Sequence, residues 1–299
     1  DCGESLHCKH CDVTMTFHKG NNQYQCHLCE FTRPADIHCP KCGTGGIRPL
    51  GFGTERVESA LQTLFPTARM ARMDQDTTRR KGQMVKILRS IQNRNVDIVV
   101  GTQMLAKGHD FPGITLVGIV CADLSLSLPD FRAGERTFQL LAQVAGRAGR
   151  GKRAGRVVMQ TFNPDHFIIQ TAQQQDFRQF FHHEVPFRKA LGYPPFARMI
   201  QIKISGRKKL AVEQLAISAA RVMTGWLENH GTPETNTQIL GPVESPIPRI
   251  SGRFRWQILV KGGLASVLNK MVTHMMSQPD CKSKSGVSIT VDVDPYSLM

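Results

Sequence analysis

The chain has 299 residues, of which 40% are hydrophobic and 21% are charged, and its formal net charge at pH 7 is +14. It contains no run of about 18 apolar residues and no secretory leader, so we exclude a membrane protein and expect a globular chain in the cytoplasm, long enough for two domains and a small module. The basic excess favours a nucleic-acid partner over a small acidic substrate, although a generally basic surface is the simpler alternative.

Cysteine spacing is the strongest signal in the first part of the chain. Seven of the nine cysteines lie within the first 42 residues, and six of these form three Cys-x2-Cys pairs. Such a pair directs two thiolates at one tetrahedral ion, so two pairs complete a structural zinc site. Disulfides are the alternative, but cysteines separated by two residues in a chain without a leader favour metal. We therefore predict two zinc sites, one short of a ligand, with these ligands: Cys2, Cys8, Cys11, Cys26, Cys29, Cys39 and Cys42.

The order of the pairs indicates which cysteines share an ion. Cys8 and Cys11 enclose a predicted hairpin, residues 15–25, and would close onto Cys26 and Cys29. Cys2 is then left with Cys39 and Cys42, and we expect the fourth ligand just upstream of Asp1. A nearby histidine could replace a missing thiolate, and the segment has so few large apolar side chains that metal would supply its folding energy.

From Gly51 the pattern changes to alternating helices and strands, which predicts a parallel sheet covered by helices, with ligand-binding loops at the strand ends. Thr54 is a candidate N-cap of the first helix. Asp74 and Asp76 could bind magnesium, but their place before a helix favours capping of backbone amides. The predicted elements are a helix at 51–65, a strand at 69–73, a helix at 77–93, strands at 96–100 and 114–121, a helix at 131–145 and a strand at 156–161.

Two segments carry the phosphate chemistry: VGTQMLAKGHDFPG at 100–113 and QVAGRAGR at 143–150. Thr102 follows a strand, where its hydroxyl can meet a nucleic-acid phosphate. Arg147 and Arg150 are three residues apart at a helix end, and permanently charged bidentate donors suit a transferring γ-phosphoryl group. The simpler alternative is a basic helix terminus that complements its own dipole.

The glycine-rich loop that holds the β- and γ-phosphates is missing. Residues 146–152 match G-x4-G-K, but Arg153 stands where a magnesium-binding Ser or Thr is needed, and the segment follows a helix instead of a strand. The chain also begins inside a cysteine pattern. We therefore expect it to be the C-terminal portion of a larger ATP-driven DNA translocase.

In the last third, the spacing of apolar residues predicts the order β-α-β-β-α-β, which is typical of a ferredoxin-like split unit. Basic residues interleave with Phe254 and Trp256, a mixture suited to phosphate contacts and base stacking on single-stranded DNA. However, Trp256, Ile258 and Val260 share one strand face, so a core position is favoured for Trp256. The predicted strands are 198–205, 238–241, 254–260 and 287–293, and the helices are 210–227 and 264–276.

Together these motifs resemble the PriA family of superfamily 2 replication-restart helicases. The resemblance rests on GTQMLAKGHDFPGITLV, QVAGRAGR, GFGTERVE, LGYPPFARM, the Cys-x2-Cys series and the terminal VDVDP. It implies an α/β fold: the second RecA-like helicase lobe with its parallel sheet, a small zinc-binding module and a C-terminal α+β domain. The implied boundaries are 1–48 for the cysteine-rich module, 49–185 for the lobe with motifs IV–VI, and 186–299 for the DNA- or partner-binding domain.

The resemblance also implies site residues, with motif V at 101–110 and motif VI at 143–150. Those expected at the reacting phosphate are Gln143, Arg147 and Arg150. Those expected to bind ATP are Lys107, Gly108 and Asp110. Thr54, Thr102 and Gln103 are expected to bind nucleic acid. The basic residues interleaved with Phe254 and Trp256 add Arg253 and Arg255 to this set.

The implied function is ATP-dependent 3′–5′ DNA unwinding that recognises stalled or forked DNA and restarts replication by primosome assembly. The implied cofactors are Zn²⁺, ATP and Mg²⁺. The implied partners are forked and single-stranded DNA, single-strand-binding protein and primosome proteins, for a monomer in the bacterial cytoplasm at the nucleoid. Because Walker A and B motifs are missing, we expect this chain alone to be inactive. The alternatives are a non-catalytic zinc-containing nucleic-acid-binding scaffold and an RNA-directed helicase of the same superfamily.

Overall fold

The computed structural model describes the chain except for residues 1–5, 12, 19–21, 27, 36–37, 39–41, 44–52, 79–81, 106–112, 127, 149–153, 231–235 and 283–285. The chain forms two compact units. One unit comprises Asp1–Pro49, Pro129–Phe131 and Glu184–Met299, and the other comprises Leu50–Leu128 and Arg132–His183. None of the described helices is long and apolar enough to cross a membrane.

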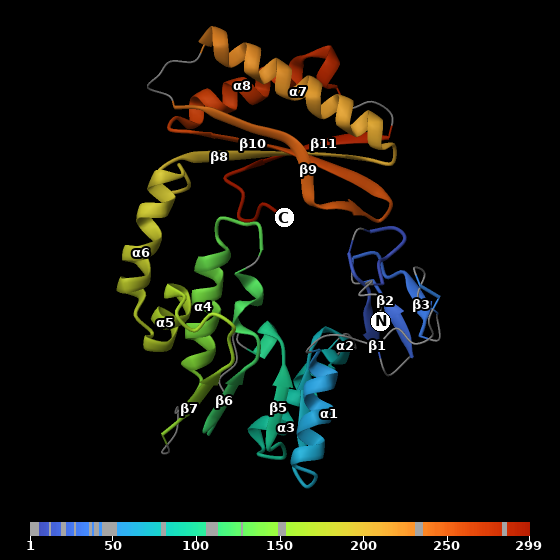
Figure 1. Cartoon of the computed structure of the whole chain (residues 1–299), viewed down its shortest axis with the longest axis vertical. Helices are drawn as coiled ribbons and strands as arrows, with labels where there is room; N and C mark the ends of the chain where they lie inside the picture. The colour runs from blue at the N-terminus through green and yellow to red at the C-terminus, as the bar shows by residue number, and fades with distance from the viewer. Residues whose placement is uncertain are drawn as a thin grey trace. The chain divides into compact units, whose positions relative to one another are not determined.

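The cysteine-rich module is a small antiparallel sheet of β1 (Thr16–His18), β2 (Gln23–Gln25) and β3 (Thr32–Pro34). It is the blue part of Figure 1. The predicted hairpin is confirmed, because Thr16 to His18 pair with Gln25 to Gln23. Its buried core consists of Leu6, Met15 and Tyr24 together with three cysteines. So small an apolar core leaves metal binding as the main source of folding energy.

The second unit has the predicted alternation of helices and parallel strands. β4 pairs with β5 and β6 pairs with β7, both in parallel. The elements are α1 (Thr54–Leu64), β4 (Met70–Met73), α2 (Gln75–Thr78), α3 (Gln83–Gln92), β5 (Ile98–Gly101), η2 (Gln103–Leu105), β6 (Leu116–Ile119), η3 (Ala122–Ser125), α4 (Ala133–Ala145), β7 (Arg156–Met159), α5 (Phe167–Gln174) and α6 (Phe177–Ala190), of which α6 runs on into the first unit.

Three details of this unit differ from the sequence prediction. The described strands form two separate parallel pairs instead of one sheet; α1 and α3 pack against β4–β5, and α4 packs against β6. The helix expected at 77–93 is two helices, because Gly82 adopts a φ of +82°, which a helix cannot continue through. Thr54 is not an N-cap: Gly53 occupies that position and has no side chain with which to cap α1.

The C-terminal domain confirms the β-α-β-β-α-β order. Its four strands form one antiparallel sheet in the order β11-β8-β10-β9, and α7 and α8 cover one face (Figure 1). Isoleucine and valine side chains of the central strands β8 and β10 pack against methionines of both helices. The elements are β8 (Arg198–Gly206), α7 (Lys209–His230), β9 (Gln238–Ile250), β10 (Arg253–Gly262), α8 (Ala265–Ser277), η5 (Pro279–Cys281) and β11 (Val287–Val293).

Two features of this sheet are informative. Trp256 is partly buried against the helix-covered core, so its core assignment is confirmed. β9 extends to Ile250, well beyond the predicted 238–241, although Pro242, Pro246 and Pro248 interrupt the strand pattern. Proline is tolerated there because β9 is an edge strand. The backbone N–H that proline lacks is not needed for pairing on the open side of the sheet.

Candidate functional site

Four thiols of the cysteine-rich module converge on one point. The sulfur atoms of Cys8, Cys11, Cys26 and Cys29 all lie within 4.8 Å of one another, and the Cys8 and Cys29 sulfurs are 3.5 Å apart. A tetrahedral zinc ion with Zn–S bonds of about 2.3 Å would place its sulfurs about 3.8 Å apart. The four thiols therefore fit a structural zinc ion with no open coordination position, and the predicted grouping of these cysteines is confirmed.

Burial favours the protonated form of the thiols in this cluster. It raises the pKa of the Cys29 thiol to about 12 and also raises that of Cys11. Burial acts the same way on Cys26, but the backbone amides of Leu28 and Cys29, together with the Cys8 and Cys29 thiols, outweigh it and lower that pKa. A bound zinc ion deprotonates its thiol ligands outright, so metal binding would release protons from these groups.

The predicted second zinc site cannot be assembled from the described residues. Cys2 and Cys39 lie outside them, and Cys42 is exposed. Among the residues that the structure does describe, no histidine joins the four clustered thiols.

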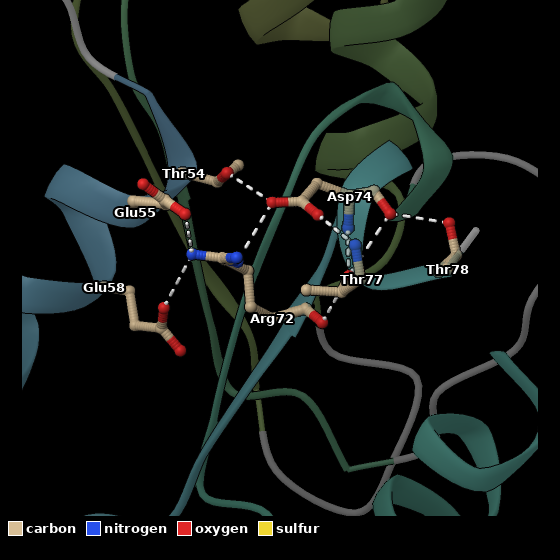
Figure 2. A network of polar contacts seen from close by, with 7 residues as sticks. All are labelled: Thr54, Glu55, Glu58, Arg72, Asp74, Thr77 and Thr78. Carbon is tan, nitrogen blue, oxygen red and sulfur yellow. Dashed lines mark hydrogen bonds and ion pairs between the residues drawn. The ribbon is translucent and has the colours of Figure 1, made fainter. Parts of the chain in front are cut away.

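A buried carboxylate, Asp74, stands at the carboxyl end of β4 (Figure 2). Its Oδ1 accepts a hydrogen bond of 2.8 Å from the Thr77 amide, and the Asp74 amide donates one of 3.0 Å to the Thr77 hydroxyl. This reciprocal arrangement caps α2, so the predicted capping role is confirmed for Asp74. Asp76, expected to lie before the helix, is instead inside α2. Its Oδ2 accepts a hydrogen bond of 2.6 Å from the Thr54 hydroxyl, so Thr54 joins α1 to β4 instead of capping α1.

Arg72 extends this network to α1. Its Nε lies 3.0 Å from Asp74 Oδ2, and its Nη1 lies 3.1 Å from Glu55 Oε1 and 3.3 Å from Glu58 Oε2. Burial by itself would raise the pKa of Asp74, but the hydrogen bonds from Thr54 and Thr77 and the charge of Arg72 hold it below its ordinary value. Asp74 is therefore an ionised, fully engaged structural carboxylate.

The motif V residues begin beside this network. Gly101 is the register partner of Met73, and a Cβ on Gly101 would collide with the Met73 carbonyl oxygen and the Leu105 side chain. Glycine is therefore required for the two strands to end side by side. Thr102 and Gln103 follow directly and are exposed. Lys107, Gly108 and Asp110 lie outside the described residues.

The motif VI residues lie at the end of α4. Gln143 is exposed in the last turn, and Arg147 is half-buried just beyond the helix. The amides of Arg147 and Ala148 donate to carbonyls three residues earlier, so the last turn tightens after Ala145. Arg150 lies outside the described residues.

Arg253 and Arg255 are tied into the sheet of the C-terminal domain. Arg253 Nη2 donates to the Ser205 carbonyl at 3.0 Å and to the Ser288 hydroxyl at 2.9 Å, which joins β10 to β8 and β11. Arg255 Nη1 donates to the Ile247 carbonyl at 3.3 Å, and burial lowers its pKa. Both guanidinium groups thus hold strands of this domain together.

Comparison with known proteins places each part of the chain. Three protein-family models match: the PriA DNA helicase Cys-rich region at residues 8–34, the helicase conserved C-terminal domain at 53–152, and the primosomal protein N C-terminal domain at 189–296. The replication restart protein PriA of Bacillus subtilis (strain 168) is 41% identical over 303 residues, which is 100% of this chain and 36% of that relative.

The chain belongs to the PriA family. The PriA proteins of Synechocystis and Haemophilus influenzae are 40% and 37% identical to it, over 99% and 100% of this chain and 35% and 40% of their own lengths. The chain thus spans well under half of the PriA relatives it matches. The matched models follow the order zinc ribbon, helicase lobe and C-terminal domain, which confirms the implied fold.

The structure brings together only some of the PriA-family residues expected from sequence. Thr54 binds Asp74, the residue after Met73, and Thr102 follows Gly101, the register partner of Met73, so both belong to the paired ends of β4 and β5. Arg72, Glu55 and Glu58 of the same network were not predicted from the sequence. A signal was present, because Glu55 and Glu58 are three residues apart on a predicted helix and so share one face.

Proposed function

We propose that this chain is part of an ATP-dependent 3′–5′ DNA helicase that recognises stalled or forked DNA and restarts replication by primosome assembly. The observation that supports this most strongly is the match of all three PriA and helicase models, in chain order, to one 299-residue sequence. The relatives it matches carry the name replication restart protein. The proposed division remains 1–48, 49–185 and 186–299.

In this proposal the lobe supplies half of an ATP site. Arg147 and Arg150 would hold the γ-phosphate of ATP, and Gln143 would contact the attacking water or phosphate, while another lobe of the full protein would supply the magnesium and triphosphate loops. Lys107, Gly108 and Asp110 would complete the nucleotide contacts. The exposed positions of Thr102 and Gln103 support their proposed role as donors to a DNA phosphate.

Substitution of the two arginines in the intact protein tests the proposal. We expect Arg147→Ala and Arg150→Ala each to reduce DNA-stimulated ATP hydrolysis by on the order of a hundredfold or more, because a permanently charged donor to the transition state is lost. Binding to forked DNA should be largely retained. Arg89→Ala is the matched control, since Arg89 is exposed on α3 of the same lobe. Normal hydrolysis in both arginine variants would refute the assigned role.

Zinc stoichiometry tests the proposed second metal site. We expect two zinc ions per full-length chain, one held by Cys8, Cys11, Cys26 and Cys29 and one by Cys2, Cys39, Cys42 and a further ligand. Cys42→Ser should reduce the count measured by mass spectrometry from two to one. A count of one in the unmodified protein, unchanged by Cys42→Ser, would remove the second site.

The proposed partners are forked and single-stranded DNA, single-strand-binding protein and primosome proteins, for a monomer acting in the bacterial cytoplasm at the nucleoid. The net charge of +14 supports a polyanionic partner, whose binding should weaken steeply with salt. Fluorescence anisotropy with forked DNA, single strands and duplex RNA at several salt concentrations would measure this. A preference for RNA would contradict the DNA assignment.

A further inference from the structure

The turn between β9 and β10 contacts the zinc-binding cysteines. Residues 250–253 form a two-residue hairpin turn, closed by pairing of Ile250 with Arg253, and both central residues have positive φ angles, +50° at Ser251 and +74° at Gly252. In such a turn the hydrogen bond across the hairpin joins the outer residues. The amides of Ser251 and Gly252 are therefore available to other acceptors.

Both amides find their acceptors in the cysteine-rich module. The Ser251 amide donates to Cys11 Sγ at 3.1 Å, and the Gly252 amide donates to the His10 carbonyl at 2.8 Å. Ile250 packs against the core of the module. Cys11 and Ser251 are 240 residues apart in the chain, and both belong to the same compact unit.

The other three thiols take their backbone donors from inside the module. Cys8 Sγ accepts from the His10 amide at 3.3 Å, Cys26 accepts from the Leu28 and Cys29 amides, and Cys29 accepts from the Phe31 amide. These donors lie two or three residues after the sulfur that they contact. Cys11 differs, since the described backbone donor to its sulfur is Ser251 of the C-terminal domain. Cys11 is 0% exposed, so bulk water cannot take the place of that donor.

A zinc ion bound by four thiolates carries a net charge of about −2, and amide donors spread that charge and hold the sulfurs in place. We propose that the β9–β10 turn is an outer part of the zinc site: the Ser251 amide stabilises the Cys11 thiolate and makes zinc retention depend on docking of the C-terminal domain. This inference rests on zinc occupying the four-cysteine cluster and is independent of helicase activity.

The proposed donor is a backbone group, so the test removes that group alone. In the full chain, Ser251→Ala serves as the reference, and replacement of its alanine by lactic acid turns the amide of residue 251 into an ester without an N–H. The matched control places glycolic acid at residue 252, which removes the hydrogen bond to the His10 carbonyl but none to a thiolate. Zinc retained by the reference in a Cys42→Ser background, measured first, establishes the four-cysteine site on its own.

Two readouts separate thiolate stabilisation from simple docking. We expect the ester at 251 to speed zinc transfer to a chromogenic chelator by on the order of 10–100-fold and to shift the sulfur-to-cobalt charge-transfer band of the Co²⁺-loaded protein. The ester at 252 should leave that band unchanged. An unshifted band with the ester at 251, or release no faster than that of the reference, would overturn the proposal.

A second pair of variants tests the link to docking by ordinary mutagenesis. Gly252→Val places a β-branched residue at φ +74° and should distort the turn, whereas Gly286→Val places the same residue at φ +87° in another turn of the same domain; a Cβ meets no atom within 4 Å at either site. We expect only Gly252→Val to accelerate zinc release. Equal release from both variants, with both domains still folded by circular dichroism, would contradict the proposed link.

Discussion

At the scale of single residues, Asp74 shows how a buried charge is stabilised by neighbouring side chains and a backbone amide. The residue is 6% exposed, and both carboxylate oxygens accept hydrogen bonds or pair with Arg72. The sequence places two aspartates before a helix, a pattern compatible with either capping or magnesium binding. Contacts with Thr54 of α1 and with Arg72 decide for a structural role, and neither contact is visible from local spacing.

Asp74 gives a pH-dependent prediction. Because its pKa in the folded state lies below the ordinary value of 3.8, its contribution to stability is complete above about pH 4 and is lost as the pH falls through the lower, folded-state value. We expect Asp74→Asn to reduce protection of α1 and β4 amides at pH 7 by about 1–3 kcal/mol and to weaken its pH dependence below pH 4.

Hydrogen exchange with peptide mass spectrometry measures both effects. Asp165→Asn is the control, because Asp165 is exposed in the same unit. Equal protection in the two variants at pH 7 would show that the Asp74 network contributes nothing to stability.

At the scale of elements, the paired ends of β4 and β5 position the motif V residues. The parallel register brings Gly101 against Met73, and the backbone approach there leaves no room for a side chain. Thr102 and Gln103 consequently follow directly on the strand end that is paired with Met73, the residue before Asp74. The prolines of β9 illustrate the opposite case, in which an edge position makes an unfavourable strand sequence acceptable.

Gly101→Ala tests the close approach. The added methyl group must displace the Met73 carbonyl or the Leu105 side chain, so we expect a loss of about 1–3 kcal/mol in the free energy of unfolding of this unit. Gly118→Ala in β6 is the matched control, since a Cβ at Gly118 meets no atom within 4 Å. The midpoint temperatures of thermal unfolding of the two variants make the comparison. An unchanged midpoint temperature for Gly101→Ala would show that the strand ends accommodate the methyl group without a loss of stability.

At the scale of the whole molecule, chain order and compact units do not coincide. The cysteine-rich module and the C-terminal domain belong to one unit, although the helicase lobe lies between them in sequence. Segment 129–131, which precedes α4, belongs to that unit as well: Asp130 Oδ2 accepts from the Ser297 hydroxyl at 2.8 Å and from the Leu298 amide at 3.2 Å. The chain terminus is anchored further by Gln201, whose Nε2 donates to the Leu298 carbonyl at 2.9 Å.

Zinc removal should therefore affect the two parts of this unit differently. We expect a strong chelator to abolish amide protection in β1, β2 and β3, because the apolar core of the module is small and metal binding is its main folding energy. The β8–β11 sheet should stay protected, since it has an extensive core of its own. Hydrogen exchange before and after chelation, with zinc added back as the control, makes the measurement. Unchanged protection of β1–β3 without zinc would contradict this expectation.

The sequence by itself determined the features that depend on short spacing: the Cys-x2-Cys pairs, the β-α-β-β-α-β order and the family motifs. These follow from local geometry, because two cysteines on one turn or apolar residues on one strand face need no distant partner. It did not indicate α5 and α6, whose Phe167 and Phe180 pack with Phe138 and Leu141 of α4 in a core that forms only between helices.

Only the tertiary structure decided which distant groups meet. Thr54 binds Asp74, Arg253 bridges three strands, and the Ser251 amide reaches Cys11 across 240 residues. Each of these contacts depends on a register or a turn conformation that is set by packing elsewhere in the unit. Local residue patterns carry no information about such partners, because burial and hydrogen-bond geometry arise only when the elements assemble.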